Sequence, residues 1–136
     1  MDKVYPEGLD NVHGLWTTMS RVCPAYEAFL DPANNVTMTF SEAAAKIESL
    51  AGQLQASGIK KGDKLSVFAE NSYKWLLLDG ATLKCGAANV VRGVAAPLDE
   101  LEFIFKDSGS VACVMQTVDL LQRLGPIIMS LDQPPS

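Results

Sequence analysis

Apolar residues recur at helical spacing in two early segments of the chain. In residues 12–30 this spacing predicts an amphipathic helix that pauses near Pro24, and it is carried by Val12, Leu15, Trp16 and Met19. In residues 41–57 the same spacing predicts the clearest helix of the sequence, with Gly58 as a left-handed stop. Between the two, "DPANN" predicts a turn and "VTMTF" predicts a short strand.

The start of the helix at residues 41–57 carries a capping signal. Thr39 precedes Glu42 by three positions, so each side chain can bond the backbone N–H of the other residue, as in a capping box. Ser41 is an alternative cap. Either residue starts the helix at the end of the short strand.

Strands and helices alternate through the rest of the chain. The strand segments are "KLSVFAE", "AANVV" and "VACVMQ". A helix from about Ser72 to Cys85 is apolar nearly all round and ends at Gly86, and a second begins at Pro97. The second helix carries four apolar residues inward, namely Leu98, Leu101, Ile104 and Phe105. Thr117 caps a final helix, "VDLLQRL", that we expect to stop at Gly125–Pro126.

This alternation predicts the α/β class, with a partial doubly wound parallel sheet flanked by helices. We expect a helical lead-in and short strand over residues 1–38, an incomplete α/β subdomain over 39–131, and a tail over 132–136. The segment "PIIMSLDQPPS" lies where a further strand is expected. The sheet is therefore predicted to have an unprotected edge, as in a fragment of a larger unit.

Composition narrows the classes of function. The chain has 136 residues, 48% of them hydrophobic, and a net charge of -5, which disfavours binding to nucleic-acid phosphates. Cys23, Cys85 and Cys113 are too dispersed for a zinc site or a disulfide framework, so reduced thiols inside a cell are expected. No signal peptide, targeting segment or membrane-spanning run is visible.

The turn after the first central strand lacks the glycines of a phosphate-binding loop. A dinucleotide fingerprint places G-x-G-x-x-G there, whereas this chain has Glu70, Asn71 and Ser72. Glu70 would repel an anion, and Asn71 or Ser72 is better explained as a helix cap. The cluster Ser108–Gly109–Ser110 precedes a strand rather than following one, so we interpret it as a helix stop.

Other polar residues also favour structural roles. His13 has no acid or nucleophile at a recognisable spacing, and the acidic group Asp99, Glu100 and Glu102 suits the positive end of a helix. Lys61–Gly62–Asp63 is interpreted as a turn between a helix and a strand rather than as a ribose-binding site, because Gly and Asp are common in such turns.

Two apolar positions also favour roles in packing. Cys113 is most simply a small buried residue, and Trp75 is assigned to core packing ahead of the wall of an apolar ligand channel. Residues and spacing alone therefore predict a fold and no catalytic constellation.

The segment "TFSEAAAKIESLAGQLQASGIKKGDKLSVFAENSYKWLLLDGATLKCGAANVVRG" resembles the amino-terminal subdomain of the AMP-forming, acyl-activating ligases. The shared positions are Thr39, Phe40, Glu42, Gly58, Gly62, Asp63, Asn71, Ser72, Trp75, Gly86 and Ala87. The segments "FAENSYKWL" and "GAANVVRG" are most similar to those of long-chain fatty acyl-CoA ligases and of plastid and cyanobacterial acyl-ACP synthetases. The resemblance runs from about Val12 to Leu124.

The resemblance implies a ligase that joins a fatty acid to CoA or acyl carrier protein through an acyl-adenylate, using ATP and Mg²⁺. The family's phosphate loop, adenine and magnesium motif, ribose motif and catalytic lysine have no counterpart in this chain, and we expect them downstream. No catalytic, cofactor-binding or metal-binding residue is therefore carried over. An intracellular protein of the plastid or cytoplasm is expected.

Two alternatives to an incomplete ligase stay open. One is a stand-alone, non-catalytic module that pairs with a full-length ligase through its exposed sheet edge. The other is a small nucleotide-binding domain, which the turn at Glu70 disfavours.

Overall fold

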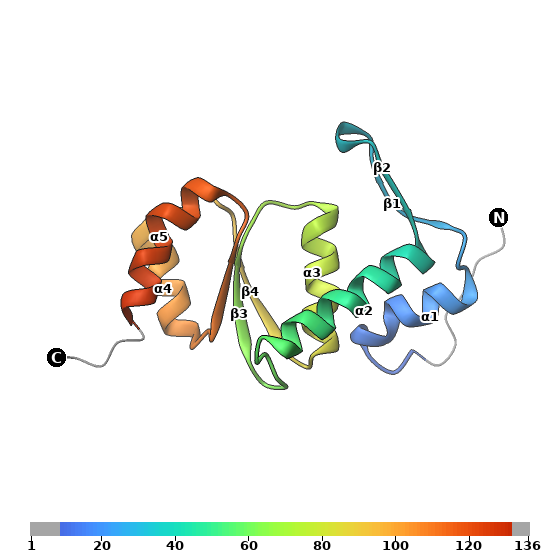
Figure 1. Ribbon diagram of the computed structural model, residues 1–136, viewed down its shortest axis with the longest axis horizontal. Helices are drawn as coiled ribbons and strands as arrows, with labels where there is room; N and C mark the ends of the chain where they lie inside the picture. The colour runs from blue at the N-terminus through green and yellow to red at the C-terminus, as the bar shows by residue number, and fades with distance from the viewer. Residues whose placement is uncertain (1–8, 132–136) are drawn as a thin grey trace.

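A parallel sheet lies at the centre of the molecule, and helices cover both of its faces (Figure 1). The computed structural model describes residues 9–131. The sheet has the order β4-β3-β5 and is formed by β3 (Lys64–Phe68), β4 (Ala88–Arg92) and β5 (Ala112–Met115). A separate antiparallel hairpin of β1 (Glu27–Asp31) and β2 (Val36–Thr39) projects away from the sheet in Figure 1. The predicted fold class, a partial parallel α/β sheet, is confirmed.

The helices divide into two groups, one for each face of the sheet (Figure 1). Helix α2 (Phe40–Ala56) and helix α3 (Tyr73–Lys84) lie on one face, and α1 (Leu15–Val22) packs against α2. Helices α4 (Leu98–Ser108) and α5 (Val118–Leu131) lie on the other. Short 3₁₀ turns, η1 (Val12–Gly14) and η2 (Pro32–Asn34), precede α1 and join the hairpin strands.

Strand β3 explains why the sheet needs helices on both faces. Its side chains alternate: Leu65 and Val67 face the α2–α3 core, whereas Phe68 packs into the α4–α5 core. All three are at most 1% exposed. A strand that is apolar on both sides can be buried only between two helical layers.

The junction between β2 and α2 is the predicted capping box. The carboxylate of Glu42 accepts the Thr39 backbone N–H at 2.8 Å, and the Thr39 hydroxyl accepts the Glu42 backbone N–H at 3.2 Å. Ser41 lies inside the helix, so the alternative cap is wrong. The helix ends as predicted before Gly58, whose φ of +98° is in the left-handed region.

The hairpin was only half predicted. The sequence pattern indicated a strand at β2 but assigned residues 27–30 to a helix pausing at Pro24, whereas α1 ends at Val22 and residues 27–31 form β1. Pairing decides the conformation of this segment, because β1 hydrogen-bonds along β2 and joins it through η2. Asn35 completes the turn with a φ of +53°.

The predicted end of the last helix at Gly125–Pro126 is wrong. Helix α5 continues through Pro126 to Leu131, so part of "PIIMSLDQPPS" is helical, and residues 132–136 lie outside the described range. Proline removes one backbone donor, a cost that burial of apolar side chains can offset. Leu120, Leu124 and Ile128 recur at helical spacing and are at most 7% exposed, so the buried face continues past the proline.

Candidate functional site

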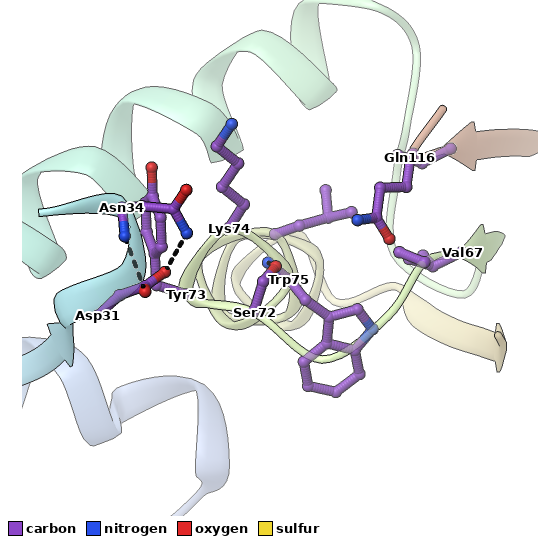
Figure 2. A pocket seen from close by; sticks show the side chains of 11 residues that line it. Asp31, Asn34, Val67, Ser72, Tyr73, Lys74, Trp75 and Gln116 are labelled. Atoms are coloured by element: carbon purple, nitrogen blue, oxygen red, sulfur yellow. Dashed lines mark hydrogen bonds between the residues drawn. The ribbon is translucent and has the colours of Figure 1, made fainter. Parts of the chain in front are cut away.

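In open α/β sheets, ligands bind at the carboxyl ends of the parallel strands. A cavity of about 450 Å³ lies there (Figure 2). Its floor comes from β3 and β5, through Val67 and Val114, and its wall from the first turns of α3. Asp31 and Asn34 of the hairpin close the other side.

Glu70 is the central residue of this edge, because it ties together the segments that follow all three strands. Its backbone N–H donates to Oε1 of Gln116, after β5, at 2.6 Å. Its carboxylate Oε1 accepts the backbone N–H of Val94, after β4, at 2.9 Å. A Cβ on Gly93 would lie 2.9 Å from that same oxygen, so the glycine leaves room for the carboxylate.

Three backbone N–H groups around this turn are bonded within the protein. The Ala69 N–H donates to the carbonyl of Arg92, the Glu70 N–H to Gln116, and the Trp75 N–H to the Ser72 hydroxyl. Ser72 is thus the N-cap of α3, as one of the two predicted alternatives required, and Asn71 is exposed. These bonded N–H groups and the neighbouring Glu70 carboxylate disfavour an ATP phosphate at this turn.

Trp75 combines core packing with a place in the cavity wall. The residue lines the cavity and also packs against the α2–α3 core. Leu78, one turn further along α3, does the same. Figure 2 shows Asp31 and Asn34 bonded to each other, with 2.7 Å between the Asn34 Nδ2 and the Asp31 carboxylate. These two residues therefore stabilise the η2 turn and need no ligand to satisfy them.

The acidic group on α4 is also satisfied locally. Asp99 and Glu100 lie in the first turn, and Glu100 pairs with Arg92 of β4 at 2.7 Å. Glu102 pairs with Lys106 one turn along the helix at 3.4 Å. His13 is exposed in η1, far along the chain from this group. The structural interpretation of these residues agrees with their contacts.

Cys113 is a poor nucleophile in this fold. It lies half-buried in β5 against the α4–α5 core, and burial raises the pKa of its thiol to about 12. A thiol with so high a pKa carries little thiolate at neutral pH. Burial also raises the pKa of Cys85, and all three cysteines are free thiols.

The serine-rich stop after α4 carries a hydrogen-bond chain that the sequence did not predict. Gly109 ends the helix with a φ of +68°, as expected. The buried hydroxyl of Ser66 on β3 then donates to Ser110 at 2.8 Å, and Ser110 bonds Ser108 at 2.7 Å. Ser66 and Ser110 are 44 residues apart, so local spacing held no signal for this contact.

The turn Lys61–Gly62–Asp63 lies at the amino end of β3, the opposite edge from the cavity. The Asp63 carboxylate accepts the Lys60 N–H at 2.9 Å, and Gly62 has a φ of +91°. This is the turn chemistry that was predicted. Within residues 9–131 no three metal-ligating side chains gather in one place, and no helix has the length and apolar character needed to cross a bilayer.

The fold and this edge define a class: a helix-covered parallel α/β domain whose first strand-to-helix turn is closed by protein contacts. The model of the AMP-binding enzyme family matches residues 17–134. The chain therefore belongs to the AMP-binding enzyme family, as the sequence resemblance predicted.

Its relatives include fatty-acid ligases. A chloroplastic long-chain-fatty-acid–acyl-carrier-protein ligase of Arabidopsis thaliana is 30% identical over 115 residues, which are 83% of this chain and 16% of the relative. A mitochondrial medium-chain acyl-CoA ligase of Homo sapiens is 35% identical over 100 residues, 74% of this chain and 16% of the relative. A long-chain-fatty-acid–CoA ligase of Mycobacterium tuberculosis is 30% identical over 75% of this chain and 20% of the relative.

Solved structures agree with the fold. The crystal structure of the N-terminal domain of FACL13 from Mycobacterium tuberculosis superposes with a TM-score of 0.81 at 27% identity. The match covers 93% of this chain and 32% of that one. The chain thus spans about a fifth or less of the length of these curated relatives.

Proposed function

We propose that this chain is the amino-terminal part of an ATP-dependent long-chain fatty-acid ligase and is not catalytic alone. In the whole enzyme, the fatty-acid carboxylate attacks the α-phosphate of ATP, which forms an acyl-adenylate and releases pyrophosphate. The thiol of CoA or of acyl carrier protein then attacks the acyl carbonyl, and AMP leaves. The similarity to long-chain and medium-chain ligases supports this reaction class.

The contacts of Glu70 support the statement that this chain is not catalytic alone. Its carboxylate and backbone N–H are bonded to the segments after β4 and β5, so these groups are not free to bind a nucleotide at the edge where many α/β folds hold one. Residues 39–131 then serve as scaffold for a site built by other parts of the enzyme. ATP, Mg²⁺ and the thiol substrate would be held there.

ATP–pyrophosphate exchange with palmitate tests this proposal. We expect exchange with the product of the full reading frame and none above background with residues 1–136, measured at equal concentration. Exchange catalysed by residues 1–136 alone would overturn the scaffold role. A stop codon directly after Ser136, with no phosphate-loop motif downstream in the gene, would overturn the ligase assignment.

A stand-alone module that pairs with a separate full-length ligase is the second candidate. One observation favours it: apolar side chains beside β5 are exposed, with Val111 at 58% and Val118 at 70%. It predicts a monodisperse chain that co-purifies with a ligase encoded elsewhere in the genome. Aggregation of the purified chain at micromolar concentration, with no ligase recovered, would exclude this candidate.

For its compartment we propose the plastid or the cytoplasm. The chloroplastic Arabidopsis relative supports the first, whereas the human relative is mitochondrial. Localisation of the full gene product fused to a fluorescent protein distinguishes these compartments.

A further inference from the structure

A buried serine lies on the central strand of the sheet. Ser66 of β3 is 0% exposed and is surrounded by apolar residues along the strand. Residues two apart on a strand share a face, so Ser66 faces the α4–α5 core together with Phe68. A buried hydroxyl is costly unless it is hydrogen-bonded, so this position needs a specific partner.

The partner of Ser66 comes from the turn that follows α4. The Ser66 hydroxyl donates to Ser110 Oγ at 2.8 Å, and Ser110 Oγ bonds Ser108 Oγ at 2.7 Å. The Ser108 hydroxyl also donates to the Phe105 carbonyl at 3.1 Å, and the same carbonyl accepts the Ser110 backbone N–H at 3.3 Å. We call the three serines the serine network. It joins the centre of β3 to the end of α4, directly before β5.

The apolar pattern of β5 does not fix how this strand aligns with β3. Its sequence is Ala-Cys-Val-Met, and successive residues pack into the α2–α3 core and the α4–α5 core in turn. A shift of two residues along β3 would keep every side chain on the same face of the sheet, because side chains alternate with a period of two. A contact of another kind must therefore distinguish the two alignments.

The serine network makes this distinction. In the observed register Ser66 aligns with Cys113. A shift of two residues would move Ser110 by about 6.6 Å along the strand, because a parallel strand rises about 3.3 Å per residue. The 2.8 Å hydrogen bond would then break and leave the Ser66 hydroxyl buried without its partner. The observed register satisfies this hydroxyl, and the shifted register does not.

The same register sets the carboxyl end of β5. Gln116 follows the strand, and its backbone N–H donates to the Phe68 carbonyl at 3.1 Å. Its side-chain Oε1 accepts the Glu70 backbone N–H at 2.6 Å. A shift of β5 would carry Gln116 away from Glu70. The polar contacts at both ends of β5 thus agree on one alignment.

We propose that the serine network selects the alignment of β5 with β3 and thereby positions Gln116 against Glu70 at the carboxyl edge of the sheet. The hydroxyls stabilise the fold little in total, because the loss of their contacts with water offsets their hydrogen bonds. Their role is to disfavour the shifted alignment, as a single buried polar residue does in a coiled coil. This role does not depend on the ligase reaction, so a failed ATP–pyrophosphate exchange assay does not bear on it.

Nuclear magnetic resonance of the 136-residue chain measures the alignment. Val114 aligns with Val67 in the observed register. The variant S66A/S110A removes both hydroxyls and leaves neither unpaired. In this variant we expect a second set of backbone signals for residues 112–116, in which Val114 no longer contacts Val67. A single set of signals with that contact intact would overturn the proposal.

Amide hydrogen exchange gives a second measurement of the same variant. The backbone N–H groups of Val111 and Gln116 donate to carbonyls of β3 and lie at the two ends of β5. Both should exchange at least about tenfold faster in S66A/S110A, because alternative alignments interconvert through opening of β5. The Ala88 amide, which bonds Asp63 on the β4 side of β3, is the control and should change little. Unchanged exchange at both ends of β5 would contradict the proposal.

Single variants separate the selection of an alignment from simple stabilisation. S110A leaves the Ser66 hydroxyl buried without its partner, so it should lower the folding equilibrium constant by about tenfold. S66A/S110A should lower it less than S110A does, and the urea midpoint of the double variant should stay close to that of the unchanged chain. Additive losses from S66A and S110A would overturn the proposal. Failure of the double variant to fold would also overturn it, because the network would then stabilise the fold outright.

T82V is the matched control for the loss of a buried hydroxyl. Thr82 is also 0% exposed, but its hydroxyl donates to the Leu78 carbonyl within α3 at 2.9 Å and does not join two strands. We expect this change to alter stability without a second set of signals for residues 112–116. A second set of signals in T82V would show that any loss in the core loosens β5, and it would remove the special role of the serine network.

Discussion

The two faces of β3 are packed in different ways. The α2–α3 face includes three alanines that are at most 3% exposed, Ala43, Ala51 and Ala81, and they let α2 and α3 approach each other beside larger core residues. The α4–α5 face depends on large side chains, of which Phe68 is fully buried. It also contains the buried pair of hydroxyls from Ser66 and Ser110.

This difference indicates that the two faces should respond differently to substitution. On the α2–α3 face, close helix packing leaves little room, so added volume should be harmful. On the α4–α5 face, a few large residues fill most of the space, so lost volume should be harmful.

Phe68→Ala should lower the free energy of unfolding by about 4 kcal/mol, because it leaves a cavity beneath α4 and α5. The measurement is urea denaturation followed by far-ultraviolet circular dichroism. Phe103→Ala on the same side of the sheet is the control, since Phe103 is 63% exposed and should cost under about 0.5 kcal/mol. Similar losses for the two variants would remove the evidence for a core centred on Phe68.

Gly80→Ala should destabilise the protein by about 1.5 kcal/mol, because the new methyl group would lie 2.9 Å from Ile47 Cδ1 and from Trp16 Nε1. Gly52→Ala is the matched control in α2, where a Cβ meets nothing within 4 Å. That change should stabilise by about 0.8 kcal/mol through helix propensity. Thermal unfolding of both variants checks the signs, and a stabilising Gly80→Ala would show that the α2–α3 face is loosely packed.

Thr39→Ala should cost about 1 kcal/mol, because it removes the cap that starts α2. Hydrogen bonds from the backbone and hydroxyl of Thr39 lower the pKa of Glu42. The variant keeps the backbone N–H of residue 39 and loses only the hydroxyl. Because a lowered pKa adds stability above the unfolded pKa that is lost on acidification, the fall in stability below about pH 5 should become slightly shallower. An unchanged Glu42 pKa in an NMR titration of the variant would contradict the capping role.

Cys113→Ala should flatten the loss of stability at alkaline pH. Burial raises the pKa of this thiol from 9.0 to about 12, so between these values the unfolded chain loses the proton first. The native state then holds more protons, and stability falls as pH rises. We expect the slope between pH 9 and pH 11 to be smaller in the variant, measured by urea denaturation. Equal slopes would show that Cys113 is more accessible than the α4–α5 core implies.

Much of the fold could be predicted from local patterns. The cap at Thr39, the stops at Gly58 and Gly109, and the β3 strand each depend on residues within a few positions of one another. The expectation that Pro126 ends the helix failed at α5, because the buried contacts of Leu124 and Ile128 continue past the proline.

The candidate site was less predictable. The sequence showed that the turn after β3 lacks glycine, and this alone argued against a phosphate loop. It could not show that Glu70 bonds Val94 and Gln116, because those partners are 24 and 46 residues away. Residues that meet only through strand pairing leave no local spacing to detect.

By itself, the sequence determined the alternation of helices and strands, the caps and stops, and membership of the ligase family, because each of these depends on neighbours in the chain or on the order of short motifs. The tertiary structure alone decided the pairing of β1 with β2, the continuation of α5 and the bonds of Glu70 to Val94 and Gln116. These features arise where distant segments meet, and only the folded chain determines which ones do.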